Sequence, residues 1–200
     1  MRLLSGFLLA VMTACSQSTP AFTVVEVTRH FDPAGKLKSE SRFLFAMNRE
    51  GSFVSVDLDP AAGSTRQIID VVNHRTLLVD PNSRTASITA LGSRGRQLPD
   101  PCDQRFRSMP GVVMSVHKSV RAISGVSVDR ISITLPNGTS METDVAPSLQ
   151  CHMLEATIRR DGAVVNKQTI ENLQLGDPDP NLFAVPAGYR ISTVKLQQAR

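Results

Sequence analysis

The sequence predicts a mainly β fold: a single curved antiparallel sheet, either a half-barrel or an open barrel meander, with one or two short helices. Extended segments alternate apolar and polar residues with the period of a strand, as Val54, Val56 and Leu58 do against Ser55 and Asp57. Turn sequences recur between these segments too often for a helical bundle. The chain has 200 residues, a length that suits one domain with a buried core.

Four hairpins are expected along the chain. "DPAG" at 32–35 and "DPNS" at 80–83 join an Asp-Pro step to small turn-forming residues. "PNG" at 136–138 and "DG" at 161–162 favour the positive backbone angles of hairpin turns. Each of these turns separates two extended segments, which is the pattern of an antiparallel meander.

Two segments show no clear strand pattern. Residues 61–72 fit a strand or a helix equally well. Residues 92–121 are rich in Pro, Arg and Met, so we expect a crossing loop there, with or without one helix. No linker divides the chain, and residues 22–200 are therefore expected to form a single β-rich domain.

The N-terminus predicts export. Arg2 gives a short positive region, and an apolar stretch of signal-peptide length follows at 3–12. This stretch is too short to span a bilayer as a permanent helix. Residues 1–14 are therefore expected to be a signal peptide.

"MTAC" at 12–15 resembles the lipobox of bacterial lipoproteins, in which small residues precede a cysteine that becomes acylated. Cys15 is then the lipidation site, and residues 15–21 tether the protein to a membrane, facing the periplasm. One alternative is ordinary cleavage after Ala21, which would release a secreted or soluble periplasmic product. Another is that the apolar stretch is an ordinary N-terminal helix of the core.

Two cysteines remain if Cys15 is acylated. In an oxidising compartment, Cys102 and Cys151 are expected to form a disulfide. Such a bridge would close a loop of about 50 residues and stabilise the fold by roughly 4 kcal/mol. The alternative is a pair of unrelated buried thiols.

The stretch "GDPDPNLFAVPAGYR" at 176–190 predicts how the sheet ends. Its two Asp-Pro steps stop the preceding strand, because proline cannot donate to a strand ladder. Leu182, Phe183 and Tyr189 are expected to pack onto the sheet as a structural lock with no catalytic role.

The same stretch resembles the C-terminal signature, PDPxLFxVPxxY, of a large group of uncharacterised exported bacterial proteins. Upstream of this stretch, weaker similarity to that group occurs in the right order at 79–91, 124–138 and 146–162. The group is similar in architecture to the periplasmic lipoprotein-carrier (LolA-like) half-barrel. The resemblance implies a curved antiparallel sheet that covers an apolar cavity.

The sequence contains no motif of a known catalytic, metal or cofactor site, so we expect a non-enzymatic protein with no catalytic residues, no metal ligands and no cofactor. The histidines are far apart in sequence, and we expect them at surface or turn positions. They are His30, His74, His117 and His152.

Charge and composition exclude one class of function and leave two. The net charge is +4, but the basic residues are scattered and aromatic residues make up 4% of the chain, which argues against nucleic-acid binding. The first remaining function is an envelope lipoprotein that binds an apolar or acyl ligand in the concave face of the sheet. The second is an envelope scaffold or interaction protein with a filled core and no ligand. A large continuous apolar cavity would favour the first.

Overall fold

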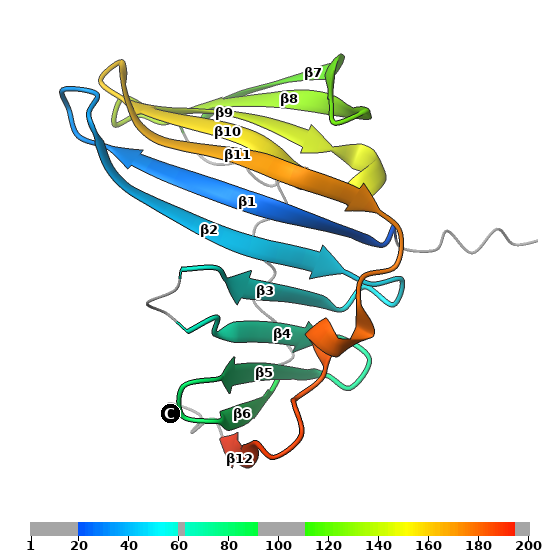
Figure 1. The fold of residues 1–200 in the computed structure, drawn as a ribbon. Helices are drawn as coiled ribbons and strands as arrows, with labels where there is room; N and C mark the ends of the chain where they lie inside the picture. Colours follow the sequence, from blue (N-terminus) through cyan, green and yellow to red (C-terminus); the bar gives the residue numbers. More distant parts are fainter. Residues whose placement is uncertain (1–19, 60–62, 92–110, 195–200) are drawn as a thin grey trace, which may run out of the picture.

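The computed structural model describes residues 20–59, 63–91 and 111–194. All of the strands described belong to one open, curved sheet, so the predicted mainly β fold is confirmed (Figure 1). The strands are β1 (Phe22–Phe31), β2 (Leu37–Met47), β3 (Phe53–Asp57), β4 (Arg66–Asp70), β5 (Arg75–Asp80), β6 (Thr85–Ala90), β7 (Val113–Ile123), β8 (Val126–Thr134), β9 (Thr139–Ala146), β10 (His152–Arg160), β11 (Ala163–Leu175) and β12 (Arg190–Val194). Their order across the sheet is β12-β6-β5-β4-β3-β2-β1-β11-β10-β9-β8-β7.

Neighbouring strands pair antiparallel, except that β12 lies parallel to β6. This pair departs from the wholly antiparallel sheet that we predicted, because β12 is reached by a long excursion from β11 and not through a hairpin. The helical elements in the described residues are two short 3-10 turns, η3 (Pro147–Leu149) and η4 (Pro180–Phe183). Neither is long and apolar enough to cross a membrane.

The four expected hairpins are confirmed, and their turn residues act as predicted. The Asp32 carboxylate accepts hydrogen bonds from the backbone amides of Ala34 and Lys36, both at 2.9 Å. The Asp80 carboxylate accepts one from the Asn82 amide at 2.8 Å. In the two other turns Gly138 and Gly162 have positive φ angles of 77° and 81°, which glycine adopts without strain.

The prediction of a crossing loop at 92–121 is wrong for the last part of this range. Residues 113–121 belong to β7, the edge strand of the sheet, whereas residues 92–110 lie outside the described residues. Met114 and Val116 alternate with exposed residues and pack against the cluster on β8. The alternation ends after His117, because the pairing shifts between His117 and Arg121 and the side chains there are exposed. The ambiguous segment 61–72 contains a strand, β4.

The sheet buries opposite faces in its two halves. On β2, Leu44 and Ala46 point to one face, which we call the outer face, while Phe45 and Met47 point to the inner face. Paired residues share a face. The outer face of β2 to β6 therefore carries one apolar cluster: Ala46, Val54, Val56, Ile68, Leu77, Val79 and Ala86.

The inner face carries a second cluster, on the other half of the sheet. Phe22 and Val24 of β1 are fully buried there and pack with Met47 and with Leu154 of β10. Leu149 of η3 joins this cluster, so the short turn covers part of the inner face. A simple half-barrel would have one apolar face. This sheet has apolar clusters on both of its faces.

Residues 176–189, the C-terminal segment, cover the outer cluster of β2 to β6. Figure 1 shows the segment in orange to red, running from the end of β11 past β3 to β5 before it reaches β12. Leu182, Phe183 and Tyr189 are half-buried and pack against the cluster. The Asp179 carboxylate begins η4 by accepting a hydrogen bond from the Asn181 amide at 2.9 Å. The three residues are placed where a lock would act, and their contribution to stability stays a prediction.

We expect Phe183→Ala to lower the free energy of unfolding by about 2 kcal/mol, less than the roughly 3–5 kcal/mol typical of a fully buried phenylalanine, because the residue is only partly buried. Asp179→Asn is the matched control, since asparagine also caps helical turns, and it should change stability by less than about 0.5 kcal/mol. Urea unfolding of the two variants checks the expectation. A Phe183→Ala variant as stable as the wild type would show that the segment is no lock.

Candidate functional site

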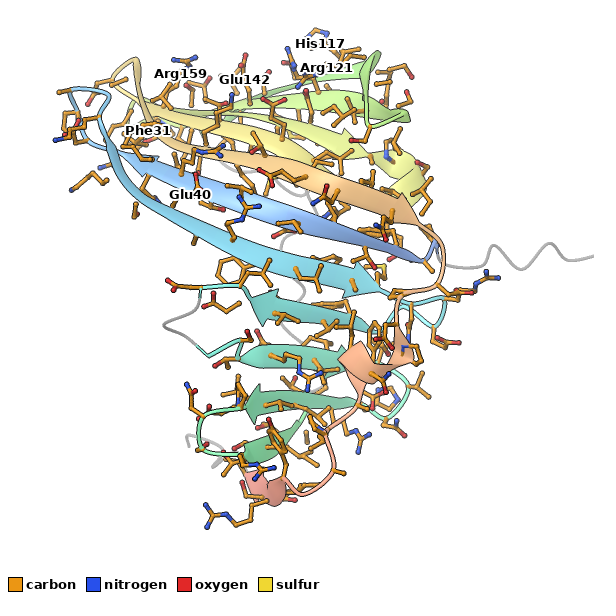
Figure 2. The ribbon with its side chains drawn as sticks, viewed as in Figure 1. Phe31, Glu40, His117, Arg121, Glu142 and Arg159 are labelled. Carbon is orange, nitrogen blue, oxygen red and sulfur yellow. The ribbon has the colours of Figure 1, made fainter. Side chains whose placement is uncertain are left out.

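Beyond β2 the outer face changes from apolar to charged. On β8, β9 and β10 the outer positions hold polar residues such as Arg130, Asp144 and Glu155, while the inner positions hold apolar ones such as Ile131 and Val145. We call the outer side of strands β7 to β11, β1 and β2 the charged face. Figure 2 labels Glu40, Glu142 and Arg121, which lie on this face on strands β2, β9 and β7.

Asp144 lies at the centre of the charged face and is only 3% exposed. Arg130 binds it with two hydrogen bonds, from Nε to Oδ1 at 2.8 Å and from Nη2 to Oδ2 at 2.9 Å. Arg121 donates a third from Nε to Oδ2 at 2.8 Å. The hydrogen bonds from Arg130 lower the pKa of Asp144 below its ordinary value against the opposing effect of burial, and those from Arg121 lower it further. The carboxylate is therefore charged at neutral pH.

Arg121 ties the edge strand to the interior of the sheet. It stands on β7 and reaches across β8 to Asp144 on β9 and to Glu155 on β10. Lys167 of β11 then lies 3.6 Å from Glu155, between Nζ and Oε1. One chain of ion pairs thus spans five strands, and we call it the arginine–carboxylate network.

A second set of ion pairs continues the charged face over β1 and β2. Arg29 contacts Glu40 at 2.7 Å and donates to Thr169 of β11 at 3.3 Å. Arg42 pairs with Glu40 and with Glu171. These side chains are about one-third exposed or more, so their pairs fix the geometry of the surface more than they stabilise the fold.

Asp129 holds the irregular part of β7 in place. Its carboxylate accepts a hydrogen bond from the Ser119 amide at 2.9 Å and binds Lys118 Nζ at 2.6 Å. Ser119 has a φ of 49°, and its pairing with β8 is interrupted there. Burial alone would raise the pKa of Asp129, but the hydrogen bonds from Lys118 and Ser119 outweigh it and keep the pKa below its usual value.

Two of the hollows on the described surface are next to the ion pairs described above or to the C-terminal segment. One of about 170 Å³ sits on the arginine–carboxylate network, next to Glu142 and Thr157. The other, of about 310 Å³, lies between the β2–β3 turn and the C-terminal segment, where Arg49 pairs with Asp177 at 2.6 Å. Both are bordered by charged side chains. Neither resembles the large apolar cavity that an acyl chain would need.

The predicted site residues are not part of the charged face. Cys15 and Cys102 lie outside the described residues, so the lipid anchor and the disulfide stay predictions. Cys151 lies in the turn that follows η3. Leu182, Phe183 and Tyr189 pack on the other half of the outer face.

One histidine is not where we expected it. His30, His74 and His117 are exposed, as predicted, but the side chain of His152 is 12% exposed. Its ring packs against Phe22 and Phe45, with centroids 4.9 and 4.6 Å away. The residue begins β10 on the inner face, where aromatic side chains of β1 and β2 gather, and its Nε2 lies 3.2 Å from Glu26 Oε1. No group of three or more potential metal ligands occurs in the described ranges.

The residues of the charged face could be found only in part from sequence. Glu155 and Thr157 alternate with the apolar Leu154, Ala156 and Ile158, and that alternation marks a solvent-facing side of a strand. The signal is weaker on the preceding strand, where the polar Thr143 separates Glu142 from Asp144. Nothing local indicates that Arg121 meets Asp144, which is 23 residues away, because the contact depends on how three strands pair.

Neither a protein-family model nor a curated protein matches the chain. An uncharacterised conserved protein from Thermus thermophilus is similar in structure, with a TM-score of 0.54 and 12% identity over 89% of this chain and 92% of that one. The MucA/MucB complex of Pseudomonas aeruginosa contains a chain with a TM-score of 0.53 and 14% identity, over 88% of this chain and 59% of that one. At these identities the similarity shows the fold alone.

The LolA-like architecture that we expected is matched only distantly. A LolA superfamily protein from Nitrosomonas europaea has a TM-score of 0.37 and 11% identity, over 83% of this chain and 90% of that one. We draw no argument about function from so low a score.

Asp144→Asn should weaken the fold at neutral pH and reduce its dependence on pH. Because the folded-state pKa of Asp144 lies below its ordinary value of 3.8, the carboxylate contributes stability above that value and loses the contribution as pH falls through the folded-state pKa. Asparagine cannot titrate, and it leaves the guanidinium groups of Arg121 and Arg130 without their charged partner. We therefore expect the free energy of unfolding to fall by roughly 2–3 kcal/mol at neutral pH.

Urea unfolding at neutral pH and at about pH 2.5 measures this effect, since the difference between wild type and variant should shrink on acidification. Glu142→Gln is the control, because Glu142 is exposed on the same strand and should change stability little at either pH. A difference of equal size at both pH values would contradict the role given to the charged Asp144.

Proposed function

We propose that this chain is an exported, non-enzymatic protein of the cell envelope that binds a partner protein through its charged face. The proposal is the second of the two functions left open by the sequence. It places the chain in the periplasm, held to a membrane through Cys15, and it makes the sheet a rigid platform instead of a ligand carrier.

The observation that carries the proposal is the filling of the inner face by the chain's own side chains. Phe22, Val24 and Leu154 are each 0% exposed, and Leu149 of η3 packs onto them. An apolar ligand bound at this place would have to displace these contacts, and each large side chain buried there contributes about 1.5–3 kcal/mol. A filled core therefore favours recognition on the outer surface.

The balance of charges indicates the kind of partner. The ion-pair networks of the charged face and the hollow beside them contain five cations, Arg29, Arg42, Arg121, Arg130 and Lys167, and five carboxylates, Glu40, Glu142, Asp144, Glu155 and Glu171. A further cation, Arg159, lies on the same side near the end of β10. Equal numbers of both signs at the centre of the face do not attract a polyanion over distance. Such a face suits a protein surface of mixed charge, which can form hydrogen bonds to both signs.

The similarity in fold to a chain of the MucA/MucB complex supports the proposal to a limited degree. That protein was solved in a complex with another protein, so the fold is compatible with such a role. Export is supported by the predicted signal peptide and by the lipobox-like "MTAC".

Photo-crosslinking in the protein's native cells tests the proposed face. A photoreactive residue at Ser132 or at Thr157, both on the charged face, should give the same crosslinked product from either position. A second substitution, Glu142→Arg, should abolish that product by placing a long cation in the middle of the face.

The control for an added arginine elsewhere is Gln67→Arg, at an exposed inner-face position on β4, which should leave the product unchanged. If crosslinks form only from inner-face positions, or if Glu142→Arg leaves the outer product intact, the charged face is not the binding surface.

A further inference from the structure

Two hairpin tips meet at one end of the sheet, far from each other in sequence. The β1–β2 turn and the β10–β11 turn lie beside one another because β11 is the neighbour of both β1 and β10. His30 near the first tip is paired with Asn166 near the second, with 3.2 Å between Nδ1 and Nδ2. Figure 1 shows the two tips side by side at the upper left, at the opposite end of β1 from Phe22.

The two tips carry four cations that form no ion pair with a carboxylate of the described residues. Lys36 and Lys38 come from the first hairpin, and Arg159 and Arg160 from the second. All four are exposed and have no ion-pair partner within the described ranges; Arg159 donates only to the carbonyl of Gly162, at 3.5 Å. Further along the same strands, by contrast, Arg29, Arg42 and Lys167 are all paired.

The turn chemistry explains why these cations are unpaired. The Asp32 carboxylate could have bound a lysine side chain. It instead accepts hydrogen bonds from the backbone amides of Ala34 and Lys36. Asp161 occupies the other turn and makes no ion pair in the described part of the chain. Four cations against these two carboxylates leave the tips with a net charge of +2. We call Lys36, Lys38, Arg159 and Arg160 the basic tip.

An exposed apolar side chain belongs to the same pair of hairpins. Leu37 lies between the two lysines in sequence, is 48% exposed and pairs across the hairpin with Phe31. The two turns project from one end of the sheet (Figure 1). Cations close in sequence to an exposed apolar residue, on projecting turns, fit the interface of an anionic bilayer.

We propose that the basic tip binds the surface of a membrane that contains anionic phospholipid, with the four cations at the phosphates and Leu37 at the acyl boundary. This goes beyond the proposed function, because it uses another part of the molecule and another partner. If Cys15 is also anchored, the chain is held at both ends of β1, since Phe22 and the tip are at opposite ends of that strand. The sheet then lies along the membrane.

Vesicle flotation of the full chain with Cys15→Ser tests the proposal without an acyl anchor. The probes are vesicles of phosphatidylcholine alone and of phosphatidylcholine mixed with phosphatidylglycerol, at low and high salt. Binding is expected only to the mixed vesicles and should weaken at high salt, because exposed charges are screened. Binding that is equal for both vesicles would overturn the proposal.

Two double variants with the same change in net charge locate the site. Lys36→Gln with Arg160→Gln removes two cations from the tip, and we expect it to lower the partition coefficient by about 10–25-fold. Arg84→Gln with Arg190→Gln removes two exposed cations that lie at the β5–β6 and β12 edge and also lack ion-pair partners in the described residues. This control should lower it by less than about 3-fold.

An equal decrease of the partition coefficient in the two double variants would show that only the net charge of the protein matters. It would contradict the assignment of the binding site to the basic tip. Thermal melts confirm that both variants fold, as expected for exposed positions. A soluble acidic peptide, polyglutamate, is the competing partner. If it binds the tip as tightly as the mixed vesicles do and with the same loss in the tip variant, the partner is an acidic protein and the membrane proposal is wrong.

Discussion

Strand β2 has to bury side chains on both of its faces, and the layout of the sheet depends on this requirement. Leu44 and Ala46 begin the outer cluster that continues to β6, while Phe45 and Met47 belong to the inner cluster shared with β1 and β10. The outer cluster needs a cover, which the C-terminal segment provides. The inner cluster is closed by its own side chains and by η3. One sheet therefore supports two cores on opposite sides.

The charged face is a consequence of that switch. On β1 the outer side still holds the buried Val25 and Val27. From β11 to β8 the apolar residues point inward, and the outer positions take polar residues. An edge strand such as β7 is a liability, because it exposes unpaired backbone groups and few of its side chains are buried. Arg121, anchored on the buried Asp144, compensates by reaching two strands inward, and Asp129 fixes the bulge. The same ion pairs that hold the edge also fix the geometry of the surface, which would lower the entropic cost of binding the proposed partner.

Local chemistry allowed much of the fold to be predicted. Asp32, Asp80, Gly138 and Gly162 act within a few residues of themselves, and the hairpins that they form were expected. Strand β7 was missed because its alternation is short: Met114 and Val116 pack onto β8, but the residues from His117 to Ala122, around the bulge, are all exposed. The ion pairs of the charged face, and the burial of His152 between phenylalanines, depend on strand register over long sequence separations, which no local pattern encodes.

Native mass spectrometry of the protein purified from its own envelope tests most directly whether this sheet is a filled platform or a carrier. A filled core predicts that the chain carries acyl groups only covalently, at Cys15, and releases no lipid when it is gently activated. A lipid bound non-covalently and in stoichiometric amount would contradict the filled core, and would restore the inner face as a binding site for an apolar ligand.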